Sequence, residues 1–152
     1  MQYTPETTQE QNIIPEYTPY KLFKTGAIGA GAFFGGIMAG AILLSENFKI
    51  LGQKKQARNT LLLSAIASFT LGVLMAFIPA MENIPRMVIP LLSGIAFQLL
   101  TNRFQKNRIE EHIENGGTTF SFWRVLGMVL LGTVCTAILI AIPIFISMLI
   151  LE

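Results

Sequence analysis

The sequence predicts an all-α, polytopic membrane protein whose transmembrane helices form an antiparallel four-helix bundle. Two observations predict this fold. Of the 152 residues, 52% are apolar and only 13% are charged, whereas a soluble domain carries about 25% charged residues. The apolar residues also occur in long runs, and such surface would aggregate if it faced water. The bilayer is therefore the expected environment of most of the chain.

Four segments have the length that a membrane crossing requires. A helix needs about 20 mostly apolar residues to cross a hydrocarbon core of roughly 30 Å. The expected spans are residues 22–44, 57–78, 84–101 and 122–151. The third helix should continue to residue 115 as a charged extension into the cytoplasm, because Gly116-Gly117 is the first stop signal after it. Residues 22–151 thus form one membrane domain, and 1–21 form a polar tail containing prolines.

The first span is rich in glycine, which is unfavourable in a helix unless its missing side chain is used. In membranes that use is close helix packing, often through pairs of small residues four apart. We therefore expect a packing face, either inside the bundle or against a second subunit, made of Gly29, Gly31, Gly35, Gly36 and Gly40. In the fourth span, Pro143 predicts a kink.

Basic residues predict the orientation, because cytoplasmic loops collect Lys and Arg. The two loops expected on one side form a basic surface for lipid or a partner: Lys49, Lys54, Lys55, Arg58, Arg103, Lys106 and Arg108. This distribution favours both termini outside the cytoplasm. Lys21 and Lys24 oppose that assignment, since they lie at the outer edge of the first span.

The sequence lacks the residues that several chemical functions require. One cysteine, Cys135, and one histidine, His112, provide neither an internal disulfide nor a Cys/His metal site. Apart from the basic residues at their ends, Lys24, Arg58, Arg86 and Arg124, the spans hold no Asp, Glu, Lys, Arg or His. This argues against proton-coupled transport and against catalysis within the bilayer. Gln98 is their one strongly polar residue and is expected to bond between helices. We expect no cofactor, no metal and no enzymatic activity.

The charged extension carries Glu110, Glu111, His112 and Glu114 within five residues. Such a cluster on an exposed helix is typical of a solvated face, so a metal site is not expected there. The basic residues are divided among separate segments rather than gathered on one broad face, which argues against nucleic-acid binding.

The remaining function classes act through the bilayer and protein contact. The favoured expectation is a non-catalytic integral membrane protein that contacts a protein partner or forms a homo-oligomer. It would be a small subunit of a membrane assembly or an immunity-type inhibitor of a pore-forming toxin. The alternative is an oligomeric passive channel or a small-solute exporter subunit.

The first 60 residues also carry a recognisable pattern: Tyr20-Lys21-Leu22-Phe23, then Phe34-Gly35-Gly36, Asn47-Phe48 and Leu51-Gly52. This pattern resembles a group of small uncharacterised bacterial inner-membrane proteins with four spans. The resemblance implies a bacterial plasma membrane and brings no known activity. It suggests that Asn47, just after the first span, is a structural cap.

Overall fold

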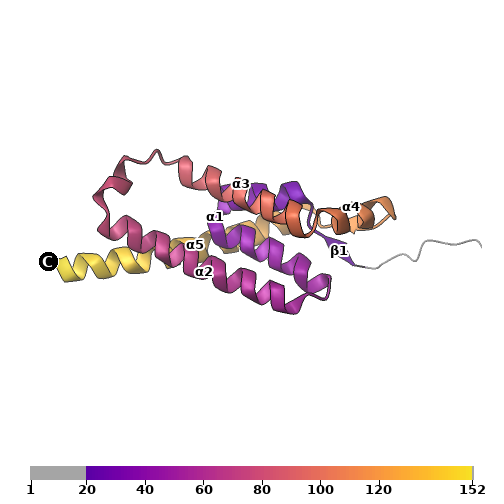
Figure 1. Ribbon diagram of the computed structural model, residues 1–152, viewed down its shortest axis with the longest axis horizontal. Helices are drawn as coiled ribbons and strands as arrows, with labels where there is room; N and C mark the ends of the chain where they lie inside the picture. The colour runs from indigo at the N-terminus through magenta and orange to yellow at the C-terminus, as the bar shows by residue number, and fades with distance from the viewer. Residues whose placement is uncertain (1–19, 152) are drawn as a thin grey trace, which may run out of the picture.

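The computed structural model describes residues 20–151, so residues 1–19 of the predicted tail over residues 1–21 lie outside the described part. Within that part, nearly all of the chain is helical (Figure 1). The elements in chain order are β1 (Lys21–Leu22), α1 (Thr25–Ile50), α2 (Lys54–Phe77), the 3-10 helix η1 (Pro79–Asn83), α3 (Val88–Phe104), α4 (Lys106–Glu114), β2 (Thr118–Thr119) and α5 (Phe122–Leu151).

By length and composition alone, three of these helices, α1, α2 and α5, could cross a membrane, while α3 is a shorter apolar helix. The all-α character and the membrane environment expected from the sequence agree with this arrangement. The bounds of α2 and α5 lie close to the expected spans 57–78 and 122–151. Pro143 lies inside α5, which continues on both sides of it, and it packs against Gly72 of α2.

Helix α1 does not run straight, because the chain reverses at Gly36. This glycine has φ 77° and ψ −173°, which are not helical angles. The backbones before and after it lie side by side, so that a methyl group added at Gly40 would touch Ala32 and one at Gly31 would touch Leu43. In one straight helix, residues eight positions apart, such as Ala32 and Gly40, would be separated by about 12 Å and could not touch. We call this folded helix the hairpin.

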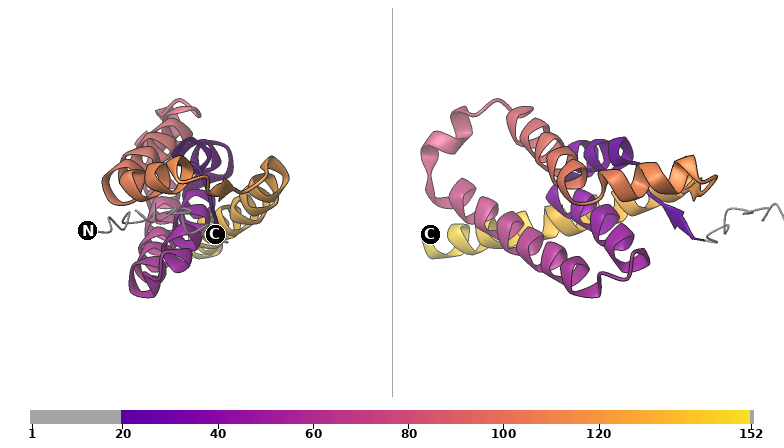
Figure 2. Two further views of the ribbon diagram at one scale, coloured as in Figure 1. Left: turned by 90° about the vertical axis from the view of Figure 1, so that its right-hand side faces the viewer. Right: turned by 45° about the vertical axis from the view of Figure 1, so that its right-hand side comes forward.

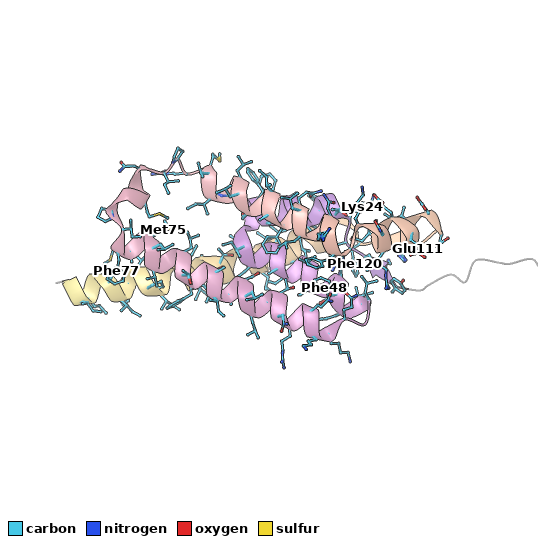
Figure 3. The ribbon with its side chains drawn as sticks, in the orientation of Figure 1. Lys24, Phe48, Met75, Phe77, Glu111 and Phe120 are labelled. Carbon is cyan, nitrogen blue, oxygen red and sulfur yellow. The ribbon has the colours of Figure 1, made fainter. Side chains whose placement is uncertain are left out.

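The hairpin begins and ends at the same end of the molecule. Lys24 and Phe48 both lie at the end where Phe120 and Glu111 are found, opposite Met75 and Phe77 (Figure 3). In Figure 2 the indigo and magenta parts of α1 form two separate rods. The positive φ of Gly36 therefore folds the expected first span, residues 22–44, into a hairpin instead of one straight helix. The expected bundle of four antiparallel spans is not confirmed.

A second correction concerns the expected helix from residue 84 to 115. Helix α3 begins only at Val88 and ends at Phe104, and α4 is a separate helix. The break falls at Gln105, whose side chain is fully buried and donates from Nε2 to the carbonyl oxygen of Leu44 at 3.2 Å. Anchoring this side chain on α1 interrupts the helix, so the charged extension is α4 alone.

The hairpin forms the centre of the fold. It packs against α2, α3 and α5, and α2 also packs against α5, whereas α2 and α3 hardly meet. The fully buried residues are concentrated in it and include Ile28, Ala32, Leu43 and Leu44. Beside its base, β1 pairs in parallel with β2, and the rings of Phe23 and Phe120 are 4.3 Å apart.

The two ends of the described chain lie at opposite ends of the bundle (Figure 1). Segment β1 lies beside α4, and the last turns of α5 lie at the far end. The expectation that both termini lie outside the cytoplasm stays a prediction, because residues 1–19 and 152 lie outside the described part of the chain.

Candidate functional site

The base of the hairpin is closed by one side chain. Asn47 is fully buried, and its Oδ1 accepts a hydrogen bond from the backbone N–H of Phe23 at 2.8 Å. Its Nδ2 donates to the carbonyl oxygen of Phe23 at 2.9 Å. Asn47 thus caps the hairpin by joining its second half to the residue just before its first half.

The tip of the hairpin is held by two hydroxyl groups from neighbouring helices. The Oγ1 atom of Thr136 accepts from the N–H of Met38 at 3.2 Å and lies 3.2 Å from the carbonyl oxygen of Gly35. Ser93 donates to the carbonyl oxygen of Ala32 at 2.9 Å. Backbone groups exposed by a helix break in a bilayer need such partners, so α3 and α5 stabilise the reversal at Gly36.

Each of the five predicted packing glycines meets a residue of its own chain. Gly31 and Gly35 lie against Val129 of α5, and Gly36 lies against Thr136. The other contacts join Gly29 to Gln98 and Gly40 to Ala32 and Phe97. Their close approach therefore serves the hairpin and its docking on α3 and α5.

One shallow groove runs between the first half of α1 and α3, and we call it the α1–α3 groove. Its volume is about 380 Å³, and its lining residues are Gly29, Ala30, Phe33, Phe34, Leu91, Gly94, Ile95, Gln98 and Leu99. The floor consists of the buried glycines Gly29 and Gly94. The rim consists of large apolar side chains that are well exposed, such as Phe34 at 76% and Leu99 at 61%.

Gln98 is the strongly polar side chain in this groove. It is half-buried, and among residues 20–151 its carboxamide makes no hydrogen bond in the structure. The bond between helices that the sequence predicted is therefore absent within the described part of the chain. A carboxamide has two donors and an acceptor, and in an apolar surrounding it is unfavourable to leave them unpaired.

A longer groove separates α2 from α3, and we call it the α2–α3 groove. It consists of three adjoining cavities of about 420, 640 and 260 Å³. The first two share Leu63, Ser64, Phe97 and Leu100, and the last two share Ile37, Leu71, Ile89 and Ser93. The groove therefore runs continuously from the N-terminal end of α2 to the tip of the hairpin.

All the lysines and arginines except Arg86 lie on elements at the hairpin-base end of the bundle, which we call the cationic end. They comprise the seven predicted residues, Lys49, Lys54, Lys55, Arg58, Arg103, Lys106 and Arg108, together with Lys21, Lys24 and Arg124. The seven are exposed. Two of them form ion pairs along a helix, Lys49 with Glu46 at 3.3 Å and Lys106 with Glu110 at 3.7 Å.

The charged cluster on α4 includes His112, which packs against neighbouring segments of the chain. His112 is buried, its Nε2 lies 3.1 Å from the carbonyl oxygen of Thr118, and its ring stacks on Tyr20 at 4.7 Å. These contacts join α4 to the segments around β1 and β2. Among the described residues, no group of three or more His, Cys, Asp or Glu side chains is placed to hold a metal ion.

Ser93 and Thr136 were foreseen only as hydroxyls that bond to their own helix or to a neighbour, and the structure shows both kinds of bond for each. Their role at the hairpin tip had no sequence signal, because the break itself was not foreseen. Gly94 was missed as part of the groove floor. Its signal is its spacing of four residues from Gln98, which places both on one helix face.

Comparison with known proteins gives no relative: no protein-family model, no curated protein and no solved structure matches the chain significantly. The resemblance to small bacterial inner-membrane proteins stays a prediction.

Proposed function

We propose that the protein is a non-catalytic membrane subunit that binds a transmembrane helix of another protein chain in the α1–α3 groove. The observation that carries this proposal is Gln98, an unpaired carboxamide on an apolar surface. Helices in membranes associate through small residues that allow close approach and through polar side chains that bond across the interface. The groove offers both features, with Gly29 and Gly94 beside Gln98.

The proposal includes an orientation. We propose that the cationic end faces the cytoplasm, because cytoplasmic segments are enriched in Lys and Arg. With the hairpin folded back, Lys21 and Lys24 join the other basic residues instead of opposing them. The segment at β1 would then be cytoplasmic, and the end of α5 would lie on the other side of the membrane. A bacterial plasma membrane is the setting that the sequence resemblance suggests.

The alternative function is a passive channel or a small-solute exporter subunit, and one observation favours it. The hairpin breaks inside the apolar layer and presents backbone groups to hydroxyls at its tip, as discontinuous helices do around transport sites. However, both hydroxyls already bond to the hairpin itself. The tip therefore has a sufficient structural explanation, and helix contact remains the favoured function.

Site-specific photocrosslinking in native membranes tests the proposal. A photoreactive amino acid at Leu99 should give a discrete crosslinked band, because this residue lines the α1–α3 groove. The same amino acid at Ile138 of α5, which is 53% exposed, serves as the matched control and should crosslink only to lipid. Gln98→Leu should weaken the Leu99 band. Equal crosslinking to protein at Leu99 and Ile138 would contradict the proposal.

A further inference from the structure

The structure points to a second site on the opposite face of α3: we infer that the α2–α3 groove binds a phospholipid of the surrounding bilayer. Its first and second cavities would hold an acyl chain, and its opening at the cationic end would hold the phosphate group. These first two cavities share no lining residue with the α1–α3 groove, which meets only the third cavity, at Phe33 and Phe34. The inference therefore stands independently of the proposed function.

Along its length the groove changes from polar to apolar, as a phospholipid does from headgroup to acyl chain. At the opening it is lined by polar side chains, Gln56, Asn59 and Thr60. Beyond them the walls are mostly apolar, from Leu63 on α2 and Leu100 on α3 to Leu74 and Ile89. A partner helix would not need polar groups gathered at one end, whereas a lipid has its phosphate and ester oxygens there.

The dimensions of the groove also suit a lipid chain. Its α2 wall extends from Gln56 to Leu74, which is about 27 Å of helix. One leaflet is half of a hydrocarbon core of roughly 30 Å. An acyl chain that enters at the level of Gln56 can therefore lie along this wall over the full depth of its leaflet. The walls are open to the exterior, since Leu63 is 67% exposed and Leu100 is 41% exposed.

Arg103 provides the charge that a phosphate requires. It follows Leu100 by three residues and Ala96 by seven, and both of these line the groove. The spacing places Arg103 on the same face of α3, at the opening. Its side chain is exposed and forms no ion pair with any described residue. Arginine binds phosphate oxygens in a fork geometry, so the free guanidinium complements an anionic headgroup.

Lipid binding by the purified full-length chain tests this inference, with native mass spectrometry after titration with phosphatidylglycerol in detergent. The wild type should bind one phosphatidylglycerol saturably and phosphatidylcholine more weakly. Arg103→Gln should reduce the affinity for phosphatidylglycerol about fivefold, the usual effect of one surface cation on anionic lipid. Lys106→Gln, which removes a cation already paired with Glu110, should change it less than twofold.

A pair of adjacent substitutions separates the groove from the general surface. Leu63→Trp places a large ring in the groove, while Leu62→Trp places it on a neighbouring, 54% exposed position that does not line it. We expect Leu63→Trp to reduce phosphatidylglycerol binding at least as much as Arg103→Gln and Leu62→Trp to leave it unchanged. Leu100→Trp fills the groove from its other wall and replaces Leu63→Trp if that variant does not fold. Equal binding by groove-filling and control variants, or no effect of Arg103→Gln, would overturn the inference.

Discussion

Asn47 and Phe23 are 24 residues apart in the chain, yet the side-chain amide of Asn47 forms hydrogen bonds of 2.8 and 2.9 Å with both backbone polar groups of Phe23. A straight helix would separate these residues by about 36 Å. Their contact therefore defines the fold of α1: its two ends meet, and its middle enters the bundle and returns.

Replacing Asn47 by alanine should destabilise the protein strongly. The variant loses both hydrogen bonds and leaves the buried N–H and carbonyl of Phe23 unsatisfied, a loss of about 2 to 4 kcal/mol. Thermal unfolding in detergent measures the effect. Ser45→Ala is the control, since Ser45 is equally buried but bonds only to Ile42 of its own helix. A similar loss for both variants would contradict the closing role of Asn47.

Replacing Gly36 by alanine should also destabilise the fold, for a backbone reason. Its φ of 77° with ψ of −173° belongs to a region occupied almost only by glycine, and other residues lose about 1 to 3 kcal/mol there. An added Cβ would also lie 2.8 Å from Thr136. Gly127→Ala is the control in denaturation experiments, because nothing lies within 4 Å of its added Cβ, and it should unfold no more easily than the wild type. If Gly36→Ala matched this control, the reversal at Gly36 would be refuted.

Two threonines of α5 should differ in their contribution to stability. Thr136→Val removes the hydroxyl that bonds to Met38 and Gly35 at the tip of the hairpin, and a loss of about 1 to 2 kcal/mol is expected. Thr133 bonds only to Val129 of its own helix and is exposed, so Thr133→Val should be within about 0.5 kcal/mol of the wild type. Chemical denaturation of the two variants compares them. Equal stability would show that the tip does not depend on Thr136.

The proposed orientation predicts which residues an impermeant thiol reagent reaches in intact cells. In a background with Cys135→Ser, a cysteine at Met87, which is 70% exposed between η1 and α3, should be labelled from outside. A cysteine at Lys55, at the cationic end, should be labelled only after the membrane is opened. The reverse pattern would place the cationic end outside.

Sequence patterns predicted α2 and α5, the long apolar helices that run without a reversal. The long apolar runs of α2 and α5 meet one dominant physical requirement, an apolar surface long enough for lipid. The length of each run therefore predicted where each helix begins and ends. The two glycines at positions 35 and 36 did not reveal the reversal, because a glycine pair is equally compatible with close packing of a straight helix and with a positive φ. The distinguishing signals were present but weak: Lys21 and Lys24 conflicted with the expected orientation, and Asn47 required a partner.

The two grooves form where neighbouring helices do not pack closely against each other. Helical spacing can place Gln98 with Gly94 and Arg103 with Leu100, but it cannot show that α2 and α3 are held apart by the hairpin between them. That separation is a tertiary property. It follows from the reversal at Gly36, so the grooves could not be predicted before the hairpin was known.

The central claim is the hairpin, and a single distance tests it. In the Cys135→Ser background, spin labels at Lys24→Cys and Lys49→Cys occupy two exposed positions at the ends of α1, and pulsed electron paramagnetic resonance measures their separation in nanodiscs. Adjacent helices lie 8 to 10 Å apart, so we predict a distance below about 20 Å. A distance near 37 Å, the length of a straight helix of 25 residues, would contradict the hairpin.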